Sequence, residues 1–473
     1  MRALALLCLL VLAAPSAVES RAGGGDSFSS GSSRSSSFGS GSSSFGSGSL
    51  GGYRSSSRSR SYSSAHHRYS GKTSNTEMVV VIALFLVFMY IKHSVEGGWE
   101  SSSPSVYSAP MPSPAAVLMP EDPAFDKDRF LARSQAAFAL VQKAWSEGDM
   151  TPVCHLLSDG VFERFQLLLE LQRREGRINR LEGLEVRDIR LARADPGGRY
   201  DCLDVRIEAS CRDAYFSAKD GSLLSESDSR FVEYWSFVRS VAARSRQGAG
   251  TVEGLCPNCG SALSVNRSAV CANCKGWVNS GEFDWVLAEI TQDGVYGPRT
   301  RDRERLAVLG HDPEATPQSL EDRASMLFWR WQRCLADRSE AALEGWCADS
   351  GIEAVLASGL GRARYVDCGV GTVDLTTVEL DEGFEAVNVA VVWDGRQVFD
   401  EAPPGPPRRR RTFITLARQA GAKTVPNSGL RSGHCSGCGA GIPPAAPVCE
   451  HCGKGFKDPA VDWVVTGLRT VDV

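Results

Sequence analysis

FVEYWSFVRS at residues 231–240 and GEFDWVLAEI at residues 281–290 are two strand-like runs that flank two C-x-x-C pairs. Aromatic and β-branched residues predominate in both runs, which is typical of paired strands. The arrangement occurs again, because FITLARQ at 413–419 and VDWVVTGL at 461–468 flank two further C-x-x-C pairs. The dipeptide Asp284-Trp285 recurs as Asp462-Trp463. We therefore predict an internal duplication in which each half ends in a strand pair clasped by cysteines.

Each set of four cysteines has the spacing of a structural zinc site. A C-x-x-C turn delivers two thiolates from one side of a metal, so two such turns supply the four ligands of a tetrahedral zinc ion. All four positions are then protein ligands, which leaves none for a catalytic water. The predicted ligands of two structural Zn²⁺ ions are Cys256, Cys259, Cys271 and Cys274 in the first half and Cys435, Cys438, Cys449 and Cys452 in the second.

Disulfides and a redox-active C-x-x-C are the alternatives to zinc. A redox motif needs one exposed pair near a βαβ pattern, whereas four pairs occur here as two matched sets, and this favours zinc. A glycine lies close after each pair, where its conformational freedom is expected to permit a tight turn. These glycines are Gly260, Gly276, Gly439 and Gly453.

Helices are predicted before the strands in each half. Apolar residues fall on one helical face within 130–145 and again within 320–331, and Thr151-Pro152 supplies a cap and an N1 proline for a second helix. The predicted core residues of the helices are Phe130, Leu131, Phe138, Val141, Trp145, Leu156, Leu157, Val161, Phe162, Phe165 and Leu169, and in the second half Leu320, Leu327, Phe328, Trp331, Leu343, Trp346, Ile352 and Val355.

Alternating apolar and polar residues then predict antiparallel strands. The buried strand faces are expected to carry Leu203, Val205 and Ile207 in the first half and Val373, Leu375, Val387, Val389 and Val391 in the second. Helices followed by strands give an α+β fold, with the helices on one face of a curved antiparallel sheet. Arg408 to Arg411 follow a proline-rich turn and are expected to form a solvated hairpin tip, with a phosphate-binding patch as the alternative.

The duplication sets the predicted domain boundaries. Asp122-Pro123 recurs as Asp312-Pro313 and Phe138 as Phe328, at one constant offset. The predicted domains are 121–291, with a zinc ribbon at 256–274, and 312–473, with a zinc ribbon at 435–452, joined by a linker at 292–311.

The N-terminal part has a different composition. Residues 1–20 resemble a secretory signal peptide, with an apolar run after Arg2. Residues 21–76 are rich in Ser, Gly and Arg and lack the apolar residues needed for a core, so they are predicted to be disordered. The uncharged run at 78–91 is predicted to be a short transmembrane helix within 77–93, followed by a Ser/Pro linker at 94–120.

Two signals disagree on membrane orientation. A translocated N-terminus places everything after Lys92 in the cytoplasm, whereas the basic residues before the apolar run favour the opposite orientation. Fifteen cysteines, eight of them in metal-binding spacing, suit a reducing compartment. We therefore predict a single-pass cell-membrane protein with cytoplasmic C-terminal domains. Pairing of Cys202 with Cys211 in an oxidising compartment would contradict this orientation. The other cysteines outside the sets and beyond the signal, Cys154, Cys334, Cys347 and Cys368, fit buried apolar positions.

Residues 122–149 (DPAFDKDRFLARSQAAFALVQKAWSEGD), VEYWSFVRS at 232–240 and FDWVLAEI at 283–290 resemble the Tim44-like domain. That family includes the membrane-associated domain of the mitochondrial import-motor scaffold and bacterial membrane-anchored relatives. The resemblance implies a cone-shaped fold related to nuclear-transport-factor-two-like or cystatin-like domains. It also implies non-enzymatic contact with lipid, membrane proteins or unfolded polypeptide. The second half lacks the E-Y-W-x-F-V-R string and has TFITLAR at 412–418 instead.

The leading interpretation is therefore a membrane-tethered, non-enzymatic scaffold. An enzyme of the cone fold is one alternative, for which Asp204, Glu208 and Tyr234 are the available acid and donor groups. Nucleic-acid binding through the zinc ribbons is another, but Arg267 and Lys275 make no basic stripe and the formal net charge is −4. We expect neither a nucleic-acid partner nor a small-molecule substrate.

Overall fold

A computed structural model describes residues 20–21, 24–25 and 122–473, apart from gaps at 197, 247, 249, 264–268, 298–308, 382, 401, 426–429, 436–437, 443–445, 447, 457 and 461. The predicted transmembrane helix and Ser/Pro linker lie outside the described residues, as does nearly all of the predicted signal peptide and of the predicted disordered segment. In the described part of the chain, no helix combines the length and the apolar character needed to cross a bilayer.

Two short strands lie where the disordered segment was predicted to begin. Strands β1 (Ser20–Arg21) and β2 (Gly24–Gly25) pair antiparallel, with Ser20 opposite Gly25. Antiparallel pairing satisfies backbone groups without any buried side chain, so composition alone does not exclude it. The predicted disorder of residues 21–76 stays a prediction, because nearly all of that segment lies outside the described residues.

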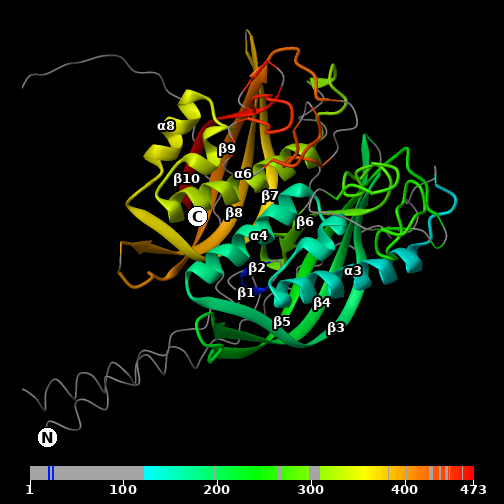
Figure 1. Cartoon of the computed structure of the whole chain (residues 1–473), viewed down its shortest axis with the longest axis horizontal. Coiled ribbons are helices and arrows are strands. Elements are labelled where there is room, and N and C mark those ends of the chain that lie inside the picture. The colour runs from blue at the N-terminus through cyan, green and yellow to red at the C-terminus, as the bar shows by residue number, and fades with distance from the viewer. Residues whose placement is uncertain are drawn as a thin grey trace, which may run out of the picture. The chain divides into compact units, whose positions relative to one another are not determined.

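The first half consists of helices followed by a four-stranded antiparallel sheet (Figure 1). Its helical elements are α3 (Lys127–Glu147), the 3-10 helix η3 (Thr151–Leu156) and α4 (Asp159–Arg174). Its strands, in spatial order, are β3 (Arg177–Asp195), β4 (Tyr200–Ser217), β5 (Leu223–Ser240) and β6 (Val286–Gln292), and η4 (Asp293–Val295) follows.

The second half repeats this order. Its helices are α6 (Pro317–Asp337), α7 (Ala341–Glu344) and α8 (Asp349–Ala357). Its antiparallel sheet consists of β7 (Ala363–Asp381), β8 (Phe384–Phe399), β9 (Pro407–Gln419) and β10 (Val464–Asp472). The α+β class and the two antiparallel sheets predicted from the sequence are thus confirmed.

Corresponding contacts hold each half together. Phe138 of α3 is fully buried with its ring centroid 5.0 Å from that of Trp235, and Phe328 of α6 is buried 5.4 Å from Trp393. The strand residues predicted to face the core, including Val205 and Leu375, are buried as well. In each half an ion pair joins a residue that precedes the first helix to the third strand. Arg239 of β5 pairs with Asp122 at 2.7 Å, and Arg418 of β9 pairs with Asp312 at 2.6 Å.

The second helix of each half is interrupted, contrary to the single helices predicted. In the first half, η3 ends before Leu157, whose backbone is extended, and α4 restarts after Ser158, whose hydroxyl accepts from the Val161 N–H at 3.3 Å. Leu157 instead forms a parallel bridge to Leu287 of β6, and Cys347 forms the corresponding bridge to Val465 of β10. Pairing with the last strand therefore breaks each helix.

The arginine run at 408–411 lies within strand β9 and is not a solvated hairpin tip. Arg410 is buried, and its guanidinium lies 4.8 Å from the ring centroid of Tyr365 and 5.3 Å from that of Trp393. Alternation along the strand sends this side chain inward while its neighbours point out. The predicted tip is wrong because β9 begins directly at Pro407.

The two halves pack through α4 and α6, which lie side by side (Figure 1). Arg330 of α6 is fully buried and donates to both carboxylate oxygens of Glu163 in α4, at 2.5 and 2.9 Å. At the sheets, Glu289 of β6 accepts from the Val373 N–H of β7 at 2.8 Å. This carboxylate covers part of the edge of the second sheet, where backbone donors would otherwise lack a strand partner.

Candidate functional site

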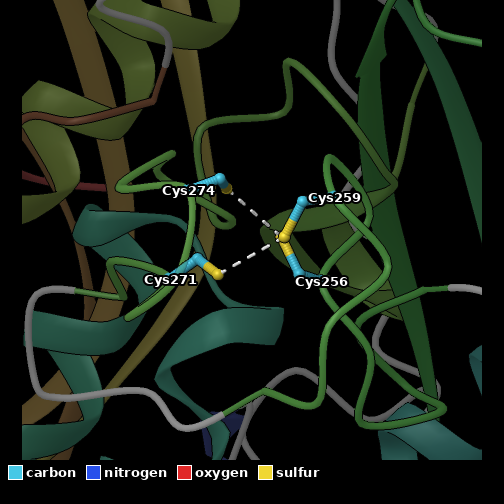
Figure 2. Close-up of side chains that lie close together, drawn as sticks. All are labelled: Cys256, Cys259, Cys271 and Cys274. Atoms are coloured by element: carbon cyan, nitrogen blue, oxygen red, sulfur yellow. Dashed lines mark hydrogen bonds between the residues drawn. The ribbon is translucent and has the colours of Figure 1, made fainter.

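The segment between β5 and β6 brings the first four cysteines together, as Figure 2 shows. Cys256 and Cys259 come from one turn, and Cys271 and Cys274 come from the other. The Sγ atoms of Cys256 and Cys274 are 3.7 Å apart, and those of Cys259 and Cys271 are 3.9 Å apart. The four sulfurs all lie within 4.8 Å of one another.

The segment between β9 and β10 builds a second cluster of the same kind. The Sγ atoms of Cys435 and Cys452 are 3.6 Å apart, and those of Cys438 and Cys449 are 3.5 Å apart. Each pair of turns carries small antiparallel bridges, from His434 to Gly441 and from Val448 to Gly455 in this half. The sequence prediction that these eight residues form two separate groups of four is consistent with this geometry.

The sulfur spacing fits a tetrahedral metal. Four thiolates at about 2.3 Å from a central zinc are about 3.8 Å from one another. A disulfide needs about 2.05 Å between its sulfurs, and none of the cysteines in the described part of the chain forms one. Both clusters can therefore hold a metal through four sulfurs, and the arrangement offers structural support without an open coordination position.

A hydrogen-bonded turn places each pair of sulfurs. The residue after the second cysteine adopts positive φ, and its N–H donates to the carbonyl of the first cysteine. Gly260 (φ 76°), Gly439 (φ 76°) and Gly453 (φ 73°) do this as predicted. In the remaining turn Lys275, not Gly276, has the positive φ, at 61°. The prediction for Gly276 is wrong because the turn geometry fixes the position directly after Cys274 and does not extend to the next residue.

The Lys275→Gly variant is expected to be more stable by about 0.5–1 kcal/mol, because a left-handed conformation is costly for a residue with a Cβ. The gain is limited because the variant also loses the 2.7 Å bond from Lys275 Nζ to the Ala272 carbonyl. Thermal unfolding of the metal-loaded protein measures the difference. Gly276→Ala is the control and is not expected to stabilise, since an added Cβ would lie 3.2 Å from Asn258 Nδ2.

The loop before the second cluster docks on the first half. Leu430 is fully buried against Tyr200, Cys202 and Val238, and its carbonyl accepts from the Asp159 N–H at 3.3 Å. The Asp159 carboxylate in turn accepts from the Gly433 N–H at 3.0 Å and bonds to the His434 ring. The second cluster is thereby attached to the start of α4, a contact for which the sequence gives no local signal.

The same junction brings the two clusters near each other. The Arg431 guanidinium lies 3.5 Å from the ring centroid of Trp277, which follows the first cluster, and donates to the Gly439 carbonyl at 3.3 Å. A Cβ on Gly439 would lie 2.3 Å from the Trp277 ring. The first cluster therefore packs closely on the second, and each metal would support the other.

A second buried carboxyl completes the junction. Asp322 of α6 accepts from the Gly160 N–H at 2.9 Å and from the Ser432 hydroxyl at 2.7 Å. Gly160 is needed here, because a Cβ would lie 2.4 Å from the Asp322 carbonyl oxygen. Burial, together with the nearby Asp159 carboxylate, raises the pKa of Asp322 to about 7. Burial also opposes ionisation of Asp159, but His434 and the Gly433 N–H outweigh it, so the pKa of Asp159 is lowered.

Asp322 is expected to make the junction less stable as the pH rises. Between the ordinary pKa of 3.8 and the folded value of about 7, the folded state holds a proton that the unfolded state releases. The free energy of unfolding therefore falls across this range and then levels off. Asp322→Asn keeps an oxygen that can accept from the Gly160 N–H. The free energy of unfolding of this variant, relative to that of wild type, is expected to be higher at pH 8 than at pH 5 by more than about 1 kcal/mol. Urea unfolding at both pH values measures this. An identical pH dependence in Asp322→Asn and in the exposed control Asp349→Asn would contradict it.

The residues considered for catalysis lie on the sheet face opposite the apolar core. Asp204 is buried, pairs with Arg193 at 2.6 Å and accepts from the Tyr296 hydroxyl at 2.9 Å. Glu208 pairs with Arg206 at 3.1 Å and with Arg230. Arginine pairing thus neutralises both carboxylates.

Cys202 and Cys211 cannot form the disulfide considered from the sequence. Both lie on strand β4, nine residues apart, which corresponds to about 30 Å along the strand. They are buried and form no disulfide, and the same holds for Cys154, Cys334 and Cys347, whereas Cys368 is half-buried.

Comparison with known proteins supports one assignment. The family model described as Tim44-like domain matches residues 116–248, which ends before the first cysteine cluster and does not include the second half. No curated protein matches the chain. One solved structure, titled "Ntf2 like protein involved in plasmid conjugation", aligns with 57% of this chain and 87% of its own at 5% identity. Its TM-score of 0.11 is too low to support a fold relationship. Residues 116–248 of this chain are therefore similar to the Tim44-like domain.

Proposed function

We propose that this protein is a membrane-tethered, non-enzymatic scaffold whose Tim44-like domain contacts lipid, membrane proteins or unfolded polypeptide. The match of residues 116–248 to the Tim44-like domain carries this proposal, since that family has a membrane-associated role. The second half, with the same element order and the corresponding Arg418–Asp312 pair, is proposed to be a divergent copy of the same domain. The apolar run at 78–91 would supply the tether.

The two cysteine clusters are proposed to hold one structural Zn²⁺ each. Four thiolates in tetrahedral spacing favour zinc or iron, and zinc adds no redox chemistry to a scaffold. When bound, the metal would fix the segments that join β5 to β6 and β9 to β10. Elemental analysis of the purified full chain tests the assignment: about two zinc ions per chain are expected. Iron with visible absorption, or no metal with oxidised cysteines, would contradict it.

Density-gradient flotation of the full chain with liposomes tests the tether. The full chain is expected to float with the vesicles and to resist alkaline extraction, while a variant lacking residues 78–91 is expected to lose that resistance. Full-length protein that sediments without vesicles, through aggregation alone, would contradict the proposal. On sealed membrane vesicles of known sidedness, an impermeant thiol reagent applied after chelation is expected to reach the cysteines only from the cytoplasmic side.

A further inference from the structure

An open pocket lies on the first half, between the start of α3 and the first cysteine cluster. Its empty space of about 460 Å³ includes open solvent, so the pocket is a shallow hollow at the surface. Five arginines line it, together with partly exposed aromatic rings of Phe125 and Phe283. The five arginines are Arg129, Arg133, Arg239, Arg244 and Arg246.

Two of these arginines have structural roles. Arg133 pairs with Asp284 at 2.6 Å, and Arg239 is buried against Asp122 at 2.7 Å. Their charges are therefore balanced by carboxylates. Asp284 and Asp126 also line the pocket, and Asp126 caps α3 by accepting from the Arg129 N–H.

Arg244 and Arg246 differ from these two. Both are exposed, and among the described residues neither forms an ion pair with a carboxylate. Arg244 donates to the Val241 and Ala243 carbonyls at 2.7 and 3.0 Å, and Arg246 donates to the Asn258 carbonyl at 3.0 Å. These backbone bonds hold the two guanidinium groups at the pocket while leaving further N–H donors for a ligand.

The first cysteine cluster builds one wall of this pocket. Asn258, which anchors Arg246, and Pro257, which lines the pocket, are the two central residues of the Cys256–Cys259 turn. The position of Arg246 therefore depends on the turn that the metal would hold.

The second half has counterparts of the ion pairs made by Arg133 and Arg239, but it has no arginine at the positions of the other three pocket arginines. Arg133 and Arg239 correspond to Arg323 and Arg418, which pair with Asp462 and Asp312. Ser245 and Thr424 both donate through N–H and hydroxyl to the aspartate of their half, and this fixes the alignment of the neighbouring residues. By that alignment the positions of Arg129, Arg244 and Arg246 are occupied by Ser319, Lys423 and Val425, and that of Phe125 by Ala315. The fold thus does not require these groups.

We propose that this pocket of the first half binds a phosphate group carried on an apolar or aromatic body, through Arg244 and Arg246. Guanidinium groups bind phosphate oxygens with paired N–H donors, and the rings of Phe125 and Phe283 provide an apolar wall beside them. The site goes beyond the scaffold role and does not depend on it, since a soluble phosphate ester or a phospholipid headgroup would present the same chemistry.

Calorimetry of the metal-loaded full chain in detergent, with phenyl phosphate as the probe, tests the site. Binding is expected for wild type, and the Arg244→Ala/Arg246→Ala double variant is expected to bind at least about tenfold more weakly, since it loses the charge-assisted hydrogen bonds to the phosphate oxygens. Lys423→Ala, the matched change in the second half, is expected to leave the affinity unchanged. Both altered arginines are exposed, and unfolding curves verify that the fold is retained. Equal affinity of the double variant and wild type, or an equal loss in Lys423→Ala, would overturn the proposal.

A second measurement distinguishes the two phosphate sources. Flotation with phosphatidylglycerol vesicles is compared between wild type and the double variant, both lacking residues 78–91. Weaker flotation of the double variant would identify a lipid headgroup, while equal flotation alongside weaker phenyl phosphate binding would identify a soluble phosphate ester. Absence of vesicle association in both proteins, alongside weaker phenyl phosphate binding by the double variant, would likewise identify a soluble phosphate ester.

Discussion

The Cys438→Ser/Cys449→Ser variant is expected to bind about one zinc ion per chain where wild type binds about two. The larger consequence is structural. Binding of a structural zinc contributes about 10–16 kcal/mol in small zinc domains, so its loss is expected to unfold the segment between β9 and β10. That segment begins with the loop that docks on α4 through Leu430 and Gly433.

Hydrogen exchange at the start of α4 reports on this undocking. The Asp159 N–H donates to the Leu430 carbonyl and the Gly160 N–H donates to Asp322, so both amides are protected by the junction. We expect their exchange to accelerate at least about tenfold in the variant. Cys368→Ala, which changes a cysteine outside both clusters, serves as the control and keeps the full metal content. Unchanged exchange at these two amides after metal loss would show that the loop docks without its cluster.

Glu163→Ala is expected to destabilise the protein by about 3–5 kcal/mol. The substitution leaves the guanidinium of Arg330, which is 0% exposed, without the carboxylate that accepts both of its bonds. Stacking of Arg330 over Trp346, at 4.6 Å from the ring centroid, keeps the charge buried and prevents it from reaching water. Because the pair joins α4 to α6, the two halves are expected to unfold in separate transitions in the variant.

The same two helices provide a matched control. Glu170 pairs with Arg333 at 3.3 Å, but both side chains are partly exposed, so Glu170→Ala is expected to cost only about 0–1 kcal/mol. Urea unfolding followed by tryptophan fluorescence measures both variants. A similar decrease in the free energy of unfolding of the two variants would mean that burial of Arg330 does not determine the stability of the junction.

Most of the features that could be predicted depend on the spacing of residues within a short stretch of sequence. Two cysteines in a C-x-x-C turn are held together by the turn itself, so both clusters could be predicted from the sequence. Apolar periodicity likewise identified the buried faces of α3, α6 and the strands, because each pattern depends on residues within one element. Lys275 was missed because a lysine carries no signal for positive φ; only the hydrogen bond to Cys271 imposes it.

Contacts between distant segments could not be predicted in this way. Arg410 was assigned to a turn because prolines precede it, yet its pairing with Trp393 places it in a strand. Ser158 starts a new helix because Leu157 bridges to Leu287, far along the chain. The signal peptide, the membrane span and the linker fall outside the described residues and stay predictions.

The sequence by itself determined the element types, the duplicated order and the cysteines that can share a metal, since these depend on neighbours within a few residues. Only the tertiary structure decided which groups meet at the junction of the halves. Asp159, Asp322 and Leu430 look like ordinary surface or loop residues in the sequence, and they become a buried cluster when α4, α6 and the second cysteine segment converge. At the pocket of the first half, tertiary structure likewise distinguishes arginines bound to carboxylates from Arg244 and Arg246, because charge balance depends on three-dimensional neighbours.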